Sequence, residues 1–258
     1  MSKSLYPTTL FHFTKSKRAF NNIIKSSFFK VSYARETIKG PTSKREFGIP
    51  MISFCDIRLS QLEKHTNSYG RFGIGLSKEW AVKNGLNPVV YMSDGCSAFD
   101  DYNQQLKRLK KIRLRIKKSL NGNKNSAFTF LNEEYRSVIG IMRYMKNYSG
   151  NLERVGKKTK INYIFADERE WRYVPSVKDL NGIPYIVNPS NINNKEKKSK
   201  YNEKLDGINL KFNFDDVKYL IVDRQESVEG LINLLNKIGV DKKHYSKIMC
   251  SKQINDDL

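Results

Sequence analysis

Short apolar or alternating segments, typical of strands with a buried face, recur along the chain. In the first half they predict strands at residues 9–14, 51–55, 72–77 and 89–92. In the second half they predict strands at residues 163–165, 170–174, 183–187, 217–222 and 248–250. Residues 35–48, rich in charge, Gly and Pro, are expected to form a mobile loop, and the polar residues 189–206 an exposed segment.

Apolar residues at helical spacing lie between these segments. They predict helices at residues 15–26, 58–65, 78–84, 99–120, 126–146 and 227–238. The helices 99–120 and 126–146 follow one another across Asn121-Gly122-Asn123 and would form a helical hairpin. We therefore expect an α+β (mixed α/β) fold, a single domain over residues 1–258, with the hairpin inserted at 97–150 between two β-rich halves.

Charge adds a preference for negatively charged partners. The 258 residues include 47 Lys and Arg against 26 Asp and Glu, a formal net charge of +21. Such a field attracts RNA, DNA or an acidic protein, although a compositional bias that only keeps the protein in solution would produce the same excess. Within the first helix of the hairpin, the candidates for binding a nucleic acid or an acidic partner are Lys107, Arg108, Lys110, Lys111, Arg113, Arg115, Lys117 and Lys118. The alternative for this helix is a solvated basic face.

Cysteine and histidine usage argues against several classes of site. Cys55, Cys96 and Cys250 are far apart, which excludes a disulfide framework or a thiolate metal site and fits a reducing cytoplasm. His65 and His244 stand alone, so we expect no metal, and a nuclease is correspondingly disfavoured. There is no apolar leader and no run of the roughly 18 apolar residues that would span a membrane, so a cytoplasmic protein without a membrane partner is expected.

Three segments place polar groups inside predicted strands. His12 follows Phe11 and precedes Phe13, so alternation puts it on the face of Leu10 and Thr14, where it would bind a ribose hydroxyl or form a core histidine bonded to backbone. The segment 69–77 contains Tyr69 and the glycines Gly70, Gly73 and Gly75. It would let a ligand approach the backbone, or would form a hairpin with glycine bulges.

The third segment contains two carboxylates, Glu168 and Glu170. On a strand, residues two apart face the same side, so the pair would share a site while Trp171 anchors the strand. Two carboxylates held together raise the pKa of one of them and leave the other to bind a hydroxyl or stabilise positive charge. The alternative is a surface strand in which Glu170 pairs with Arg172 or with the basic insertion.

Taken together, five motifs resemble the AbiGi family of bacterial abortive-infection proteins. They are Leu10-Phe11-His12-Phe13-Thr14, the segments 49–57, 69–81 and 87–91, and Glu168-Arg169-Glu170-Trp171-Arg172. The resemblance implies a role in phage resistance, as the antitoxin half of a two-gene system whose toxin is a nucleotidyltransferase.

A more remote resemblance concerns the ADP-ribosyltransferase fold, which has a split, twisted β core. It implies that NAD+ is the substrate, that His12 holds its ribose and that Tyr69 or a nearby aromatic stacks on nicotinamide. It also implies that Glu170 stabilises an oxocarbenium-like transition state while Glu168 orients the acceptor. The implied NAD+-binding set is His12, Thr14, Tyr69, Gly73, Gly75 and Ser77. The sequence departs from the pattern at Gly75, where many such enzymes have Tyr.

Two functions follow from these resemblances. The first is an anti-phage effector, similar to ADP-ribosyltransferases, that uses NAD+ to modify a nucleic acid or a protein. The alternative is a non-enzymatic antitoxin that binds DNA, a partner nucleotidyltransferase toxin, or both.

Overall fold

The computed structural model describes residues 7–119, 126–152 and 158–257. Its centre is an eight-stranded mixed sheet in the order β14-β13-β5-β1-β4-β11-β6, with β3 paired to β4 off this path. The strands are β1 (Thr9–Thr14), β3 (Ser32–Lys39), β4 (Lys44–Cys55), β5 (Phe72–Ser77), β6 (Asn87–Pro88), β11 (Glu170–Tyr173), β13 (Val217–Val222) and β14 (Ile248–Cys250). The only parallel pair in this sheet, among the described residues, is β13 with β14.

Three two-stranded sheets flank the central one. They join β2 (Phe28–Lys30) to β12 (Asn209–Lys211), β7 (Val90–Met92) to β8 (Met145–Asn147), and β9 (Ser149–Leu152) to β10 (Lys160–Ile164). The helices are α1 (Lys17–Ser26), α2 (Leu62–Tyr69), α3 (Lys78–Lys83), α4 (Ala98–Ser119), α5 (Ser126–Met142), α6 (Lys195–Glu203), α7 (Glu226–Lys237) and α8 (Ser251–Asp257).

Strand alternation divides the side chains of the central sheet between two cores. On one face Leu10, Phe54 and Ile74 pack with residues of α1, α3 and α7. On the other face Phe11, Cys55 and Ile221 pack with Leu62 of α2 and Ile254 of α8. Burying apolar surface on both faces of a sheet is the usual way in which such a layer is stabilised.

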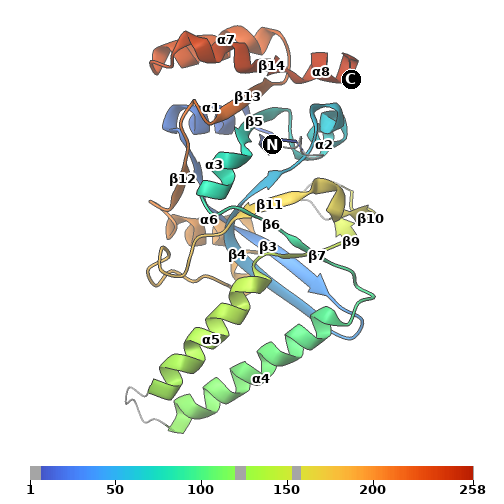
Figure 1. Ribbon diagram of the computed structural model, residues 1–258, viewed down its shortest axis with the longest axis vertical. Coiled ribbons are helices and arrows are strands. Elements are labelled where there is room, and N and C mark those ends of the chain that lie inside the picture. Colours follow the sequence, from blue (N-terminus) through green and yellow to red (C-terminus); the bar gives the residue numbers. More distant parts are fainter. Residues whose placement is uncertain (1–6, 120–125, 153–157, 258) are drawn as a thin grey trace.

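A third core lies where β3 and β4 extend away from the rest of the sheet. Ile38, Phe47 and Ile49 of these strands pack with Phe99 and Leu106 of α4 and with Tyr135 and Ile139 of α5. Beyond this contact the two helices project from the sheet as an arm (Figure 1).

Several predicted elements are confirmed in the structure. The strands at 9–14, 72–77, 217–222 and 248–250 have the expected bounds. The two hairpin helices and the helix near 227–238 are also present, as α4, α5 and α7. The shorter helices α1 and α3 are present as well, and a local signal marks the start of each. The Ser16 hydroxyl accepts from the Ala19 amide of α1, and the Ser77 hydroxyl accepts from the Trp80 amide of α3.

Other predictions are wrong. Residues 35–48 are not a loop but most of the β3–β4 hairpin, because Ile38 and Phe47 are buried by helices distant in sequence. The second hairpin helix ends at Met142 instead of 146, and residues 145–147 form β8. In 183–187 the only strand-like feature is one bridge from Val187 to Gly48. The prediction for 189–206 is confirmed for most of the segment, which is exposed or half-buried apart from Ile192 and Leu205 and which contains a 3-10 turn and α6. The division into domains stays a prediction.

The glycines of β5 leave space for aromatic rings of β1. A Cβ added at Gly75 would lie 2.8 Å from Cε1 of Phe11, and one at Gly73 would lie 2.6 Å from Cε1 of Phe13. Phe11 and Phe13 stack on each other with ring centroids 5.7 Å apart. These glycines therefore make room for the protein's own side chains.

We expect Gly75→Ala to lower the free energy of unfolding by about 1–3 kcal/mol, because the buried Phe11 ring has to move to admit the methyl group. Urea denaturation would measure the change. Gly140→Ala is the matched control, since nothing lies within 4 Å of its added Cβ, and alanine in a helix raises stability by up to about 1 kcal/mol. Equal denaturation midpoints for the two variants would contradict this account of β5.

Candidate functional site

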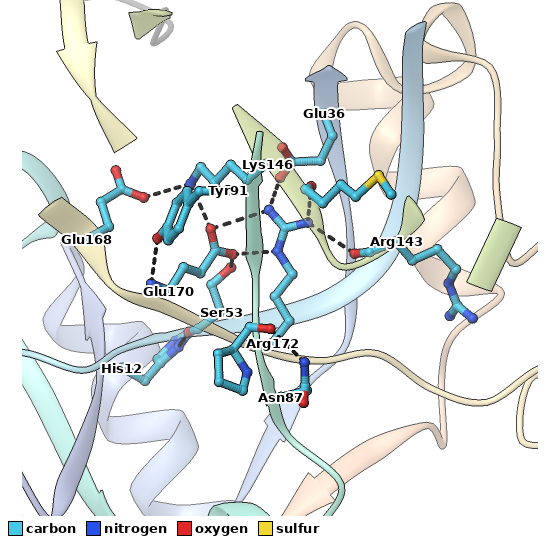
Figure 2. A network of polar contacts seen from close by, with 12 residues as sticks. His12, Glu36, Ser53, Asn87, Tyr91, Arg143, Lys146, Glu168, Glu170 and Arg172 are labelled. Atoms are coloured by element: carbon cyan, nitrogen blue, oxygen red, sulfur yellow. Dashed lines mark hydrogen bonds and ion pairs between the residues drawn. The ribbon is translucent and has the colours of Figure 1, made fainter. Parts of the chain in front are cut away.

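A cluster of charged side chains is buried around the start of β11. Glu170 is its centre: Arg172 Nε lies 2.7 Å and Ser53 Oγ 2.8 Å from Glu170 Oε1, while Lys146 Nζ lies 2.7 Å from Oε2 (Figure 2). The backbone amide of Glu170 donates to the hydroxyl of Tyr91 at 2.8 Å. Both carboxylate oxygens of Glu170 are thus occupied, and the residue is 4% exposed.

Arg172 links this carboxylate to two further elements. Its Nη2 lies 2.6 Å from Oε1 of Glu36 on β3. Its Nη1 donates to the carbonyl oxygens of Arg143, at the end of α5, and of Met145 on β8, at 3.1 and 3.3 Å. Burial alone would lower the pKa of Arg172, but the carboxylates of Glu170 and Glu36 outweigh it and raise that pKa, so the guanidinium stays charged.

Glu168 reaches the same cluster from a different local structure. It ends a 3-10 turn, Phe165–Glu168, and Arg169 then adopts a left-handed conformation with φ 43° before β11 begins. The predicted strand alternation of Glu168 and Glu170 is therefore wrong. Their carboxylates nevertheless meet at Lys146, whose Nζ lies 2.6 Å from Glu168 Oε2 (Figure 2). Glu168 Oε1 is hydrogen-bonded to the hydroxyl of Tyr69.

The two carboxyls have opposite pKa shifts. Burial would raise the pKa of Glu170, but Arg172 and Lys146 lower it well below its usual range, so Glu170 is ionised. Burial and the nearby charges of Glu170 and Glu36 raise the pKa of Glu168 to about 9. The single ammonium of Lys146 is already balanced by Glu170, and Glu168 accordingly keeps its proton at neutral pH. One neutral and one ionised carboxyl side by side is an arrangement found in acid–base sites.

The structure places His12 on the opposite face of the sheet. Phe11 pairs with Cys55, and Cys55 pairs with Glu170, so these three side chains share one face. His12 alternates to the other face, where its ring contacts Phe29 and Phe54. Its Nδ1 lies 2.9 Å from the carbonyl oxygen of Ser53, and burial, partly offset by this bond, lowers its pKa.

The other predicted NAD+-binding residues are engaged within the protein. The hydroxyl of Thr14 accepts from the Ser16 amide, and Ser77 caps α3. Tyr69 lies at the end of α2 with its ring stacked on His65, at a centroid distance of 4.4 Å. Of the predicted catalytic and NAD+-binding residues, the structure therefore brings together Tyr69, Glu168 and Glu170, and places the rest elsewhere.

Four members of the cluster were not predicted as site residues. Ser53 lay in a predicted strand, Lys146 in the last turn of a predicted helix, Glu36 in a predicted loop, and Tyr91 in a strand without a polar role. Arg172 was foreseen only as a pairing partner of Glu170. No local signal marks the four, because the long-range pairing of β3, β4, β7 and β8 brings them together.

The basic residues of α4 form the second candidate site. Seven of the eight are exposed, and none of the eight forms a salt bridge in the part of the chain that the structure describes. The eighth, Arg113, is half-buried. Its guanidinium lies over the ring of Tyr135 at 4.3 Å and donates to Asn132 Oδ1 at 3.2 Å. Arg113 thus belongs to the seam between α4 and α5.

Metal-binding clusters and membrane-spanning helices are absent from the described residues. These residues contain no group of three or more His, Cys, Asp or Glu side chains that is arranged to hold a metal ion. No helix formed by them has the length and apolar character needed to cross a bilayer.

Comparison with known proteins gives a family. Residues 13–223 match the family model described as "Putative abortive phage resistance protein AbiGi, antitoxin". The chain belongs to the AbiGi family. It is 27% identical over 241 residues to the abortive phage resistance protein AbiGi of Lactococcus lactis subsp. cremoris, covering 85% of this chain and 92% of that protein. No solved structure matches, so the resemblance to ADP-ribosyltransferases gains no support from known folds.

The raised pKa of Glu168 predicts a specific pH dependence. The carboxyl is protonated in the folded protein up to about pH 9 but ionises near pH 4.5 when unfolded, so its contribution to stability is complete below pH 4.5 and is lost as pH rises towards 9. Glu168→Gln mimics the protonated form and removes this dependence. We expect the stability difference, wild type minus variant, measured by urea denaturation, to fall steadily from pH 5 to pH 9. A difference that stays constant with pH would contradict the assignment.

Proposed function

We propose that this chain acts in abortive infection as a non-enzymatic antitoxin that binds a polyanionic macromolecule through α4. Membership of the AbiGi family, whose model is described as an antitoxin, supports the role in phage resistance. The observation that carries the binding mode is the exposed basic surface of α4, which has no internal counterions among the described residues. Charges left without partners on a projecting arm favour association with an anionic partner.

The buried cluster supports a structural role for the carboxylates under this proposal. Glu170 is 4% exposed and both its oxygens are already bonded, so a substrate would first have to displace Arg172, Ser53 or Lys146. Breaking a buried ion pair by removing one partner costs about 3–5 kcal/mol. His12, which the transferase mechanism would pair with Glu170, lies on the other face of the sheet.

Replacing four exposed cations by Gln, at Lys107, Lys111, Arg115 and Lys118, should abolish neutralisation of the partner toxin, because it removes about half of the basic surface of α4. Viable counts of cells that co-express the toxin encoded with this protein would measure neutralisation. The control is Glu168→Gln, which leaves α4 unchanged and should neutralise like the wild type. Full neutralisation by the four-fold variant, with normal expression, would overturn the proposal.

A second candidate is NAD+-dependent ADP-ribosyl transfer. What favours it is the pairing of a neutral Glu168 with an ionised Glu170, next to the hydroxyl of Tyr69. In this candidate Glu170 would stabilise positive charge on the ribose as nicotinamide leaves, and Glu168 would orient the acceptor.

Incubation with NAD+ labelled in the nicotinamide ring tests this candidate. It predicts nicotinamide release by the wild type and at least about 100-fold less by Glu170→Gln, because the positive charge that develops on the ribose then lacks its stabilising carboxylate. Circular dichroism would establish that the variant is folded. No release by the wild type, with RNA, DNA and protein acceptors present, would eliminate the candidate and leave the antitoxin proposal intact.

A further inference from the structure

The exposed basic residues of α4 cover a wider sector of the helix surface than a helix usually uses to pack on one protein. Successive residues of a helix are about 100° apart. Relative to Leu106, which packs in the core with α5, the seven exposed cations occupy an arc from about 20° to about 200°. They are Lys107, Arg108, Lys110, Lys111, Arg115, Lys117 and Lys118. A helix face that packs on a protein is typically about 100° wide, so half of these cations would face away from a flat acidic surface.

The charge of the arm is also strongly asymmetric. Between Asp101 and Glu133 the sequence contains nine Lys or Arg and no acidic residue. The acidic residues of α5, Glu133 and Glu134, are both exposed. α5 carries these two carboxylates near the exposed Arg136, so the excess of positive charge, and with it the attraction for an anionic ligand, lies on α4.

The dimensions match a nucleic acid. From Lys107 to Lys118 the helix rises about 16 Å, at 1.5 Å per residue. A duplex carries one phosphate per roughly 1.7 Å of its axis, on two strands that flank each groove. A helix in a groove thus meets phosphates on both sides, which suits a basic arc of about 180°. The arm also exposes some apolar side chains, among them Ile112 and Leu114 of α4 and Phe130 of α5.

Resting on the proposed function, we propose that the partner of α4 is the sugar–phosphate backbone of a nucleic acid, bound by these seven cations without base recognition. Arg113 takes no part, because the Tyr135 ring and Asn132 hold its guanidinium in the seam between the helices. The eight basic residues therefore divide into seven that contact phosphate and one that positions α4 on α5.

Fluorescence anisotropy with 20-base-pair DNA, 20-base-pair RNA and a single-stranded 20-mer, from 50 to 200 mM salt, tests this. With seven contacted phosphates, the slope of log K against log salt should be about −6 for the duplexes and about −5 for the single strand, at roughly 0.9 and 0.7 per phosphate. Lys111→Gln or Arg115→Gln should each reduce the slope by about 1. Arg113→Gln should leave the slope unchanged while lowering the melting temperature of the protein.

Two controls make the outcome decisive. Lys200→Gln on α6 removes the same charge from another surface, where Lys200 pairs with Glu196, and should leave the slope unchanged. Polyglutamate represents an acidic protein and should bind more weakly than any of the nucleic acids. No binding of nucleic acid at 50 mM salt, tighter binding of polyglutamate, or equal slopes for Lys111→Gln and wild type would each overturn the inference.

The same variants separate this inference from the antitoxin proposal. If Lys111→Gln and Arg115→Gln weaken neutralisation but no nucleic acid binds, the partner is a protein and only the inference fails. If nucleic acid binds as described but the four-fold variant still neutralises the toxin, the inference stands and the antitoxin proposal fails.

Discussion

The buried ion pair between Arg172 and Glu170 connects parts of the protein that the chain itself keeps far apart. Through one guanidinium, β11 is joined to β3, to β8 and to Arg143, the residue that follows α5. Arg172 is fully buried, so each of its donors has to find an acceptor within the protein. The partners it finds are the carboxylates of Glu170 and Glu36 and the carbonyl oxygens of Arg143, just after α5, and of Met145, on β8. Proteins have a free energy of unfolding of only about 5–15 kcal/mol, so an uncompensated charge at this point would remove a large part of that stability.

The same cluster explains why two neighbouring carboxyls differ. Glu170 is held by Arg172 and Lys146, while Glu168 shares Lys146 but has no cation of its own within the cluster. A buried site with a limited number of cations cannot ionise every acid, and the excess is met by retaining a proton. This proton is a structural consequence of charge balance, whether or not any chemistry uses it.

Local patterns in the sequence were sufficient where burial is decided within a few residues. The strand Thr9–Thr14 alternates between two cores, and α3 begins at its own capping serine, so both could be predicted. The β3–β4 hairpin could not, because Ile38 and Phe47 are buried by α4 and α5, from a distant part of the chain. His12 and Glu170 were expected to share a cleft. Which face each one occupies depends on the pairing of Phe11 with Cys55 and of Cys55 with Glu170, and no periodicity within a single strand contains that register.

The arm formed by α4 and α5 is fastened at both of its roots. At the start of α4, the carboxylate of Asp100 accepts hydrogen bonds from Thr42 and Ser43 in the β3–β4 turn, and Asn103 accepts from Arg45. At the end of α5, Arg172 holds the carbonyl oxygen of Arg143. In the part of the chain that the structure describes, these hydrogen bonds hold the arm at its base, and the outer half of the arm lies beyond them. Substitutions there can alter what the arm contacts, or how far it extends, without disturbing the fold. An arm fixed at its base is therefore a part of the protein whose length and surface charge can change during evolution while the sheet stays the same.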